Sequence, residues 1–312
     1  MTERVATTPG VYPLPDWAKD DLSDLKGHQK GDLISGDEGE ELTAVYDEAR
    51  VEVVERQQEA GLDRIVEGQL RWDDMLAHPL AVHDSVETQG IVRYYDNNNF
   101  YRDPVVVDGL DFDGDVAAEL TAAAETTDSL QAVLPGPYSL ADLATDEYYG
   151  DDEEFLAAIG EFLAGEVEAF PDVETLFLLD PSLVTAPPAD GEDARASEAI
   201  DAVASAADAD VVVQSYWGSL SEKVHAHLLD ADIDAVGYDL VTDHEGAIHN
   251  VNEFGTKESV ALGLVDGQNT LVESPETIAE RVDWFEEQTP VNEFETVYLT
   301  ANTELFYLPY AK

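Results

Sequence analysis

Short apolar runs rich in β-branched residues recur along the chain, and most are followed by a segment with apolar residues at helical spacing. Eight runs have the length and composition of buried strands: residues 5–8, 63–67, 130–134, 174–179, 209–213, 233–238, 260–265 and 295–299. Helical periodicity covers residues 40–60, 114–127, 151–169, 193–207, 219–229 and 275–288. Ser274 before Pro275 is typical of an N-cap followed by an N1 proline. Alternation of strands and helices predicts a parallel sheet.

Eight such strands in 312 residues favour an α/β fold with a single (β/α)8 TIM barrel, residues 1–312 forming one domain. An open doubly wound sheet is the alternative. No glycine-rich turn of the nucleotide-binding type follows the first strand, which counts against a nucleotide site.

Three polar segments follow predicted strands, at the face where barrels carry their active sites. Residues 68–112 interrupt the alternation and are rich in tyrosine, which predicts a hairpin insertion after strand 2. Residues 181–193 and 239–257 are predicted to be loops. His244 and His249 lie in the second of these. They could bind a metal, or hold a metal-binding residue in place, at the active-site face, and the simpler interpretation is that they are solvated loop residues.

Charge changes this picture more than any motif does. The chain has 69 acidic residues against 15 basic ones, a net charge of −54, spread over nearly every predicted helix and loop. Such a coat is typical of proteins from salt-loving cells such as halophilic archaea, where multimolar salt shortens the Debye length to ~3 Å or less. The same field repels nucleic acids and anionic membranes, so neither is expected as a partner.

Cysteine is absent, which excludes disulfides, thiolate nucleophiles and cysteine-based zinc sites. No apolar run has transmembrane length, and the first residues lack the pattern of a signal peptide. The sequence therefore predicts a soluble cytoplasmic protein.

Several strand-end segments resemble cobalamin-independent methionine synthase. The resemblance is collinear from end to end and is carried by TTPGVYPLP (7–15), AGLDRIVEGQLRWDDM (60–75), LPGPYSLADLA (134–144), LFLLDPSL (176–183), VVVQSYWGSL (211–220), VALGLVDGQNTLVESPETIAERV (260–282) and VYLTANTELFYLP (297–309). The segment 260–282 matches best. The family resemblance implies a 5-methyltetrahydropteroyltriglutamate–homocysteine methyltransferase-like barrel.

The resemblance also implies a zinc site, from which this sequence departs. In the family, zinc binds the homocysteine sulfur and lowers its pKa, so that a thiolate attacks the methyl group. The family's His and Cys ligands align here with Gln214 and Tyr216, its Glu falls near Asp239, and its last Cys aligns with Thr303. Glutamine and threonine are poor zinc ligands. We therefore expect no metal and no cofactor on this chain.

The residues that hold homocysteine in the family are changed as well. Gln69 and Leu179 replace the two acids that hold the ammonium group, with Asp180 following, and Val11 replaces a serine that meets the carboxylate. Replacing two anions by neutral groups removes the charge-assisted pairing that an ammonium needs.

A set of polar residues is nevertheless expected near the barrel mouth, and these are our substrate-binding candidates: Gln69, Arg71, Asp74, Asp180, Gln214, Tyr216, Asp239 and Asn302. Arg71 could grip a carboxylate or a polyglutamate tail, or could be paired with Asp73 or Asp74. Arg93 and Arg102 flank the tyrosine-rich insertion, whose rings could stack a pterin-like ring or pack within the hairpin. No pair among these residues dictates a reaction, so the catalytic residues stay unknown.

Three functions follow from these observations. The first is the zinc-free half of a split methionine synthase, working with a separate zinc-bearing chain and a folate-type methyl donor. The second is a non-catalytic binding or scaffold barrel that keeps only the fold. The third is a related barrel that acts on a corrinoid or on porphyrin carboxylates, which would need a wide, arginine-rich mouth.

Overall fold

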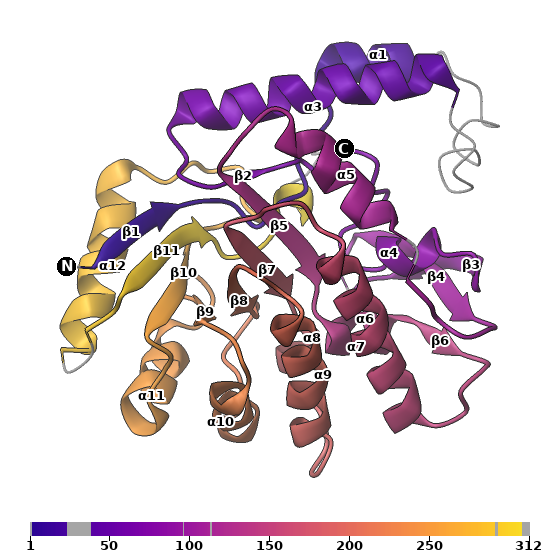
Figure 1. The fold of residues 1–312 in the computed structure, drawn as a ribbon. Coiled ribbons are helices and arrows are strands. Elements are labelled where there is room, and N and C mark those ends of the chain that lie inside the picture. Colours follow the sequence, from indigo (N-terminus) through magenta and orange to yellow (C-terminus); the bar gives the residue numbers. More distant parts are fainter. Residues whose placement is uncertain (1, 24–38, 96, 113, 291–292, 308–312) are drawn as a thin grey trace.

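Eight parallel strands curl into a barrel in the computed structural model, which describes residues 2–23, 39–95, 97–112, 114–290 and 293–307 (Figure 1). The strands are β1 (Glu3–Ala6), β2 (Ile65–Val66), β5 (Leu130–Pro135), β7 (Thr175–Leu179), β8 (Asp210–Gln214), β9 (Ala235–Asp239), β10 (Ser259–Val265) and β11 (Thr296–Ala301). Their order in the sheet is β1-β11-β10-β9-β8-β7-β5-β2. All eight predicted strands are confirmed, and no strand end is shifted by more than two residues.

The two ends of this sheet, β1 and β2, meet through individual backbone hydrogen bonds. The N–H groups of Asp63 and Arg64 donate to the Ala6 carbonyl at 2.9 and 3.3 Å, and the Tyr12 N–H donates to the Gly68 carbonyl at 2.9 Å. The predicted (β/α)8 barrel is confirmed.

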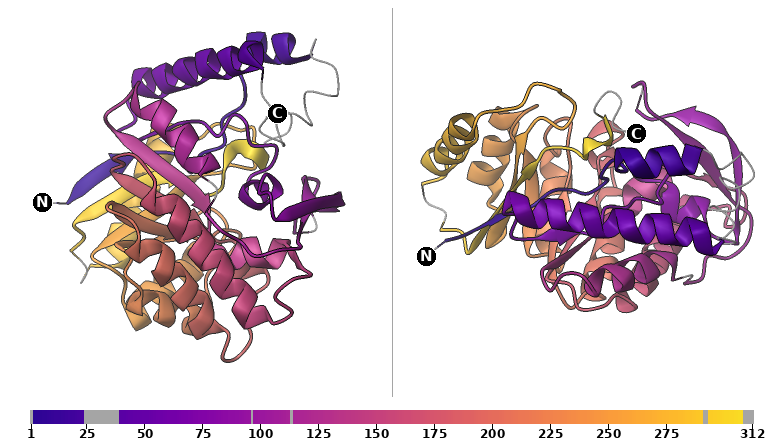
Figure 2. Two further views of the ribbon diagram at one scale, coloured as in Figure 1. Left: turned by 45° about the vertical axis from the view of Figure 1, so that its right-hand side comes forward. Right: turned by 90° about the horizontal axis from the view of Figure 1, so that it is seen from above.

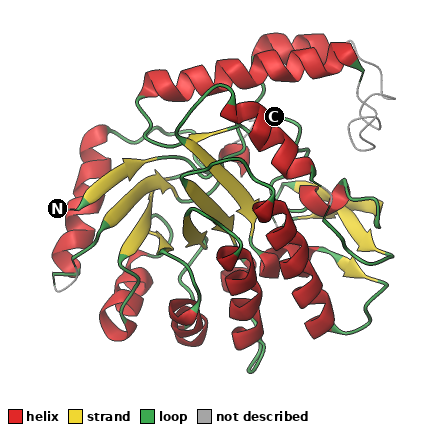
Figure 3. Ribbon diagram, viewed as in Figure 1, coloured by secondary structure: helices red, strands yellow, loops and turns green. Residues whose placement is uncertain are grey.

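Helices surround the sheet on its outer side (Figure 3). Six match the predicted helical segments: α3 (Glu40–Ala60), α5 (Asp115–Ala124), α7 (Asp152–Glu168), α9 (Asp193–Ser205), α10 (Glu222–Asp230) and α12 (Pro275–Gln288). Five more are α1 (Asp16–Ser23), α4 (His78–Ala81), α6 (Pro137–Leu143), α8 (Ser182–Thr185) and α11 (His244–Phe254). Ser274 caps α12 as predicted, because its hydroxyl accepts the Thr277 N–H at 3.2 Å. None of the helices in the described part of the chain combines the length and the apolarity needed to cross a membrane.

Two predicted loops contain helices, so those predictions were wrong. Within residues 239–257, α11 begins at an N-cap, where the Asp243 side chain accepts the Gly246 N–H at 3.0 Å. The helix buries Ala247 and Val251, one turn apart, against the barrel. Histidine, asparagine, glutamate and glycine make up most of this segment, so its composition indicated a loop although its apolar residues lie on one face of the helix. Likewise, the short helix α8 occupies part of residues 181–193.

The predicted insertion after strand 2 is confirmed. Strands β3 (Val86–Arg93) and β4 (Phe100–Val106) form an antiparallel hairpin, and β6 (Thr145–Asp146) pairs with β4 in parallel. We call these three strands the small sheet. It projects from the side of the barrel (Figure 2).

The core has an outer layer between the sheet and the helices, and an inner layer inside the barrel. The inner layer includes Phe177 and Tyr298, whose rings meet edge to face at 5.9 Å. Leu179 is also buried there. The barrel interior is therefore a packed core, and chemistry is left to the loops at its carboxyl end.

Candidate functional site at the barrel mouth

Three predicted residues converge where β8, β9 and β11 end. Gln214 is the last residue of β8, Asp239 is the last of β9, and Asn302 follows β11 directly. The Gln214 amide donates to the carbonyls of Ala301 and Asn302 at 3.0 and 2.8 Å. The Asn302 amide donates to both carboxylate oxygens of Asp239 at 3.2 Å. We call Gln214, Asp239 and Asn302 the strand-end network. It joins three strands through buried side chains.

Asp239 is saturated by donors from its own chain. Beyond Asn302, its oxygens accept the backbone N–H groups of Trp217, Val241 and Thr242 at 2.9, 3.0 and 2.9 Å. A carboxylate with this many donors is held in place and has little capacity left to bind a ligand.

The residues at the expected metal position do not fit zinc. Zinc in proteins prefers thiolate, imidazole and carboxylate ligands. Here Thr303 donates its hydroxyl to the Glu304 carbonyl at 3.1 Å, and Tyr216 donates its hydroxyl to the Glu304 carboxyl group at 3.0 Å. Within the described ranges, no group of three or more His, Cys, Asp or Glu side chains has the geometry to hold a metal ion.

The two histidines that could rebuild a metal site lie elsewhere. Both are exposed on α11 rather than in a loop at the mouth. His244 meets the Trp284 ring edge to face at 5.1 Å, and His249 lies 3.6 Å from the Glu222 carboxylate. Their contacts are therefore with Trp284 and Glu222, whereas the Asp239 carboxylate binds Asn302 within the strand-end network.

Glu304 is a site residue that the sequence did not reveal. It is fully buried beside the strand-end network, and burial raises the pKa of its carboxyl group to about 8. One oxygen accepts the Tyr216 hydroxyl, while the other has no hydrogen-bond partner among the described residues. At neutral pH this group is mostly a neutral acid. One acid among 69 gave no signal of burial.

Gln69 and Arg71, both after β2, contact the protein's own groups. Gln69 adopts a positive φ of 53°, and its side-chain oxygen accepts the Val11 N–H at 2.8 Å. Arg71 binds Glu119 of α5 at 2.7 and 3.0 Å and lies over the Tyr46 ring at 4.6 Å. Arg71 therefore grips the Glu119 carboxylate, which neither interpretation of the sequence had named.

A second buried acid, Glu67, lies close to this ion pair. Burial, with the Glu119 carboxylate nearby, raises the pKa of Glu67 to about 8. It lines a small cavity together with Gln69, Trp72 and Gln131. The sequence gave no sign of this role, because Glu67 is only one more acid in an acid-rich chain.

Asp74 and Asp180 stabilise turns. Asp74 accepts the N–H groups of Leu76 and Ala77 at 2.9 and 2.7 Å, and burial raises its pKa. Asp180 accepts the N–H and hydroxyl of Ser139 at 2.8 and 2.5 Å, and burial raises its pKa to about 7. A Cβ atom on Gly136 would lie 2.2 Å from this carboxyl group, so the turn needs glycine there.

Aromatic rings fill the space above these polar groups. We call them the mouth cluster: Tyr94, Tyr95, Tyr101, Tyr216, Trp217 and Tyr307. Tyr94 and Tyr101 lie 4.4 Å apart, Tyr95 and Trp217 5.1 Å, and Trp217 and Tyr307 4.9 Å between ring centroids. The rings of the insertion therefore pack against one another and against the barrel, which is the packing alternative for this hairpin.

Backbone strain is concentrated at the same mouth. Among the described residues, the four non-glycine positions with positive φ are Val11, Gln69, Tyr95 and Trp217. Bulky and β-branched residues rarely adopt this conformation, at a cost of about 1–3 kcal/mol each. All four follow barrel strands or lie in the insertion, so the mouth is the strained part of the fold.

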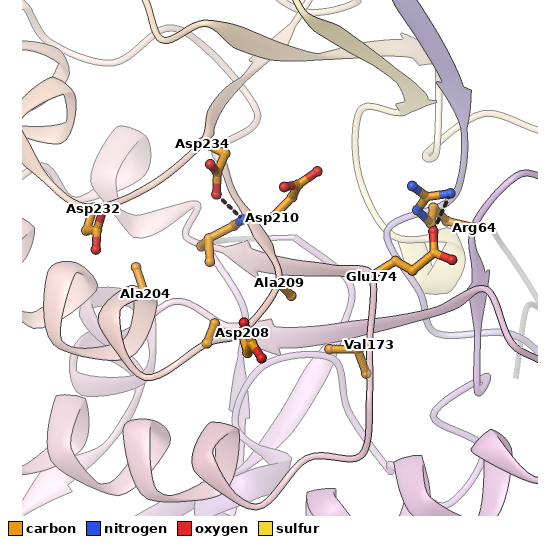
Figure 4. Close-up of a pocket in the computed structure, with 11 residues that line it drawn as sticks. Arg64, Val173, Glu174, Ala204, Asp208, Ala209, Asp210, Asp232 and Asp234 are labelled. Carbon is orange, nitrogen blue, oxygen red and sulfur yellow. Dashed lines mark hydrogen bonds and ion pairs between the residues drawn. The ribbon is translucent and has the colours of Figure 1, made fainter.

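A second depression lies at the opposite end of the barrel (Figure 4). It is lined where β7, β8 and β9 begin, and Arg64 pairs there with Glu174 at 2.8 Å. The Asp210 carboxylate accepts the Tyr298 hydroxyl at 2.7 Å, and Asp234 accepts the Val211 N–H at 2.7 Å. Polar groups at the amino ends of barrel strands usually serve stability. The mouth therefore remains the candidate site.

Comparison with known proteins shows which family this sequence matches. Residues 24–297 match the model of the cobalamin-independent synthase catalytic domain. The methionine synthase of Saccharolobus solfataricus is 23% identical over 279 residues, which cover 88% of this chain and 80% of that protein. The methionine synthase of Sulfolobus acidocaldarius is 23% identical over 296 residues, with 90% and 81% covered.

Solved structures show the same fold. A B12-independent methionine synthase from Shewanella in complex with selenomethionine superposes with a TM-score of 0.78 at 16% identity, covering 98% of this chain and 92% of the other. A putative vitamin-B12-independent methionine synthase from Listeria monocytogenes gives 0.70 at 18% identity, with the same shares covered.

Proposed function

Since this chain belongs to the cobalamin-independent methionine synthase family, we propose that it serves methionine synthesis as the zinc-free half of a two-chain enzyme. A separate chain would carry the zinc ion that activates homocysteine. The methyl donor would be of the folate type, as the family resemblance implies.

The observation that carries this proposal is the strand-end network. It stands where the family resemblance expects zinc ligands, and its amide and carboxylate groups are already bonded to one another. Asp239 has donors on both oxygens, so a metal would have to displace several hydrogen bonds. Loss of one such bond in a buried site costs about 1–3 kcal/mol.

A partner role, rather than loss of all function, is favoured by the strained mouth. Residues such as Tyr95 and Trp217 keep a costly positive φ, with values of 38° and 69°. Strain of this kind persists mainly where function needs a particular geometry. Trp217 and Tyr95 are also only partly buried, so their rings could meet a ligand or a second chain.

The test is a methyl-transfer assay with a folate-type donor and homocysteine, in concentrated KCl. The reactions contain this chain alone with and without zinc, a cysteine-bearing family member alone, and both chains together. We expect no methionine from this chain alone and a faster reaction from the mixture than from the partner alone. Zinc-dependent methyl transfer by this chain alone would overturn the proposal, and so would a mixture no faster than the partner.

A non-catalytic scaffold barrel is the second candidate, and the mouth cluster favours it. Its rings contact one another and so leave less room for a substrate. The two candidates differ in thermal unfolding with added folate or homocysteine. A ligand that binds the folded chain raises its stability by mass action, whereas a pure scaffold shows no shift.

A further inference from the structure

Glu67 follows β2 directly, and its side chain is buried. One carboxyl oxygen, Oε1, accepts the Gln69 N–H at 2.6 Å. The other, Oε2, has no hydrogen-bond partner among the described residues. Buried polar atoms in folded proteins are nearly always hydrogen-bonded, either within the protein or to ordered water. This oxygen therefore indicates a bound molecule.

The Glu67 carboxyl group carries a proton at neutral pH. Burial raises the pKa of Glu67 to about 8, with the Glu119 carboxylate adding to the rise and Arg50 and Arg71 opposing it. Oε1 already accepts a hydrogen bond, so the proton belongs on Oε2. Oε2 is then a hydroxyl donor, and its partner has to be a hydrogen-bond acceptor.

The cavity that Glu67 lines has room for one small molecule. The space that the centre of a water molecule can occupy there is 10 Å³. One ordered water needs about 10–15 Å³ by this measure, together with two to four polar partners. Gln69 and Gln131 also line this cavity, so polar groups are at hand.

Both glutamines can accept a further hydrogen bond. The Gln69 amide oxygen accepts the Val11 N–H at 2.8 Å, and the Gln131 amide oxygen accepts the Thr7 hydroxyl at 2.7 Å. A carbonyl oxygen has two lone pairs, so each amide oxygen keeps one for another donor. Both side chains are buried, so bulk solvent does not supply that donor.

A neutral molecule suits this cavity better than an ion does. A cation would have to displace the Glu67 proton, while Arg50 and Arg71 are close enough to act on the same carboxyl group. An anion would face this carboxyl group and the Glu119 carboxylate. Water carries no charge, and it can accept the hydrogen bond from Oε2 while donating two of its own.

We propose that this cavity binds one internal water molecule, which accepts the Glu67 hydroxyl and donates to the amide oxygens of Gln69 and Gln131. The water then has three protein partners, within the range that internal waters need. Gln131 belongs to β5, so the water joins that strand to the turn after β2.

The same water contributes to the strained mouth. Glu67 binds the Gln69 N–H, and Gln69 in turn binds the Val11 N–H. Gln69 and Val11 have positive φ values of 53° and 52°, which non-glycine residues seldom adopt. A Glu67 side chain fixed by the water holds Gln69 and, through it, Val11. Glu67 is thus a positioning residue for two turns of the mouth.

The direct test is a high-resolution crystal structure of the full chain, grown from concentrated KCl. We expect the electron density of one water at hydrogen-bond distance, about 2.5–3.0 Å, from Glu67 Oε2 and close to both glutamine amide oxygens. A map with no density at this position would overturn the proposal. A potassium ion there, recognised by its anomalous scattering, would do the same.

Oxygen-17 relaxation dispersion tests the site in solution, because it counts the long-lived internal waters of a protein. Glu67→Leu removes the hydroxyl donor, so the count should fall by one per chain. Glu67→Gln keeps an oxygen for the Gln69 N–H and an amide group that donates to the water, so the count should stay the same. Glu87→Leu, at an exposed position, is the control and should also leave it unchanged. An equal count for the wild-type chain and Glu67→Leu would contradict the proposal.

Unfolding in urea at pH 6 tests the positioning role. Glu67→Leu leaves the Gln69 N–H without its acceptor, and it should lower the folding equilibrium constant by roughly tenfold or more. Glu67→Gln should stay within about threefold of the wild-type value, because it preserves both hydrogen bonds. If Glu67→Gln destabilises the chain as much as Glu67→Leu does, the carboxyl group does not hold the turns through these bonds.

Discussion

Replacing Asn302 by alanine is the sharpest perturbation of the strand-end network. Asn302 is 1% exposed, donates to both oxygens of Asp239, and accepts the Gly267 N–H at 2.9 Å. The substitution leaves the Gly267 N–H buried without its acceptor and removes one of four donors from Asp239. One orphaned buried group costs about 1–3 kcal/mol and one lost hydrogen bond about 1 kcal/mol. The expected loss is therefore about 2–4 kcal/mol of unfolding free energy.

Urea unfolding at constant KCl, followed by circular dichroism, measures this loss. The midpoint should fall while the slope with denaturant stays unchanged, because the surface exposed on unfolding is the same. Asn269→Ala is the control, since the exposed Asn269 side chain accepts the Leu271 N–H at 3.0 Å and should matter little. A loss below about 1 kcal/mol for Asn302→Ala would refute the view that these side chains hold the strand ends together.

Asn302→Asp extends this test through pH. The new carboxyl group would face the Asp239 oxygens, which the Asn302 amide nitrogen meets at 3.2 Å. Two carboxylates at this distance cannot both ionise without repulsion, so the folded pair would retain a proton. The loss of stability should then grow as pH rises from 5 to 8. A loss that does not change with pH would mean that the two groups move apart.

Two further predictions concern buried charge. Burial raises the pKa of Glu304 to about 8, so the folded state keeps a proton that the unfolded state releases above pH 4.5, and stability should decline as pH rises to about 8. Glu304→Gln can still accept the Tyr216 hydroxyl, and it should flatten this decline when unfolding free energies are measured from pH 5 to 9. Glu245→Gln, at an exposed position, is the control and should leave the decline unchanged. If Glu304→Gln does not change the slope of unfolding free energy against pH, Glu304 is not buried as a neutral acid. Arg71→Ala should lower the unfolding free energy by about 1–3 kcal/mol, because Arg71 is mostly buried against Glu119. The variant should still increase the rate of methyl transfer by a partner chain as much as the wild-type chain does. If the variant no longer increases the partner's methyl-transfer rate but keeps its unfolding free energy, Arg71 binds a ligand instead of only stabilising the fold.

The strands could be predicted because each is a buried run long enough to stand out. Residues 130–134 and 260–265 are nearly all apolar, and their structural counterparts are buried almost throughout. Helix α11 could not be predicted in the same way. It buries only a narrow stripe around Ala247 and Val251, and its exposed face has the polar composition of a loop. Tertiary packing decides such segments.

The candidate site was predictable in position but not in its contacts. Gln214, Asp239 and Asn302 could be placed at the mouth because strand ends share one face of a barrel. The partner of Arg71 could not be foreseen, since Glu119 lies 48 residues away and reaches it only through the packing of α5. Glu304 was hidden for another reason. In a chain with 69 acidic residues, the presence of an acid says nothing about whether it is buried.

The zinc content of the purified chain tests the central claim most directly. The chain would be kept in concentrated KCl, dialysed against trace zinc and analysed by mass spectrometry, beside a cysteine-bearing family member as the positive control. The geometry around Gln214, Asp239 and Asn302 predicts far less than one zinc ion per chain, with no change in thermal stability on adding zinc. Stoichiometric zinc would contradict this account and make the chain a candidate catalyst in its own right.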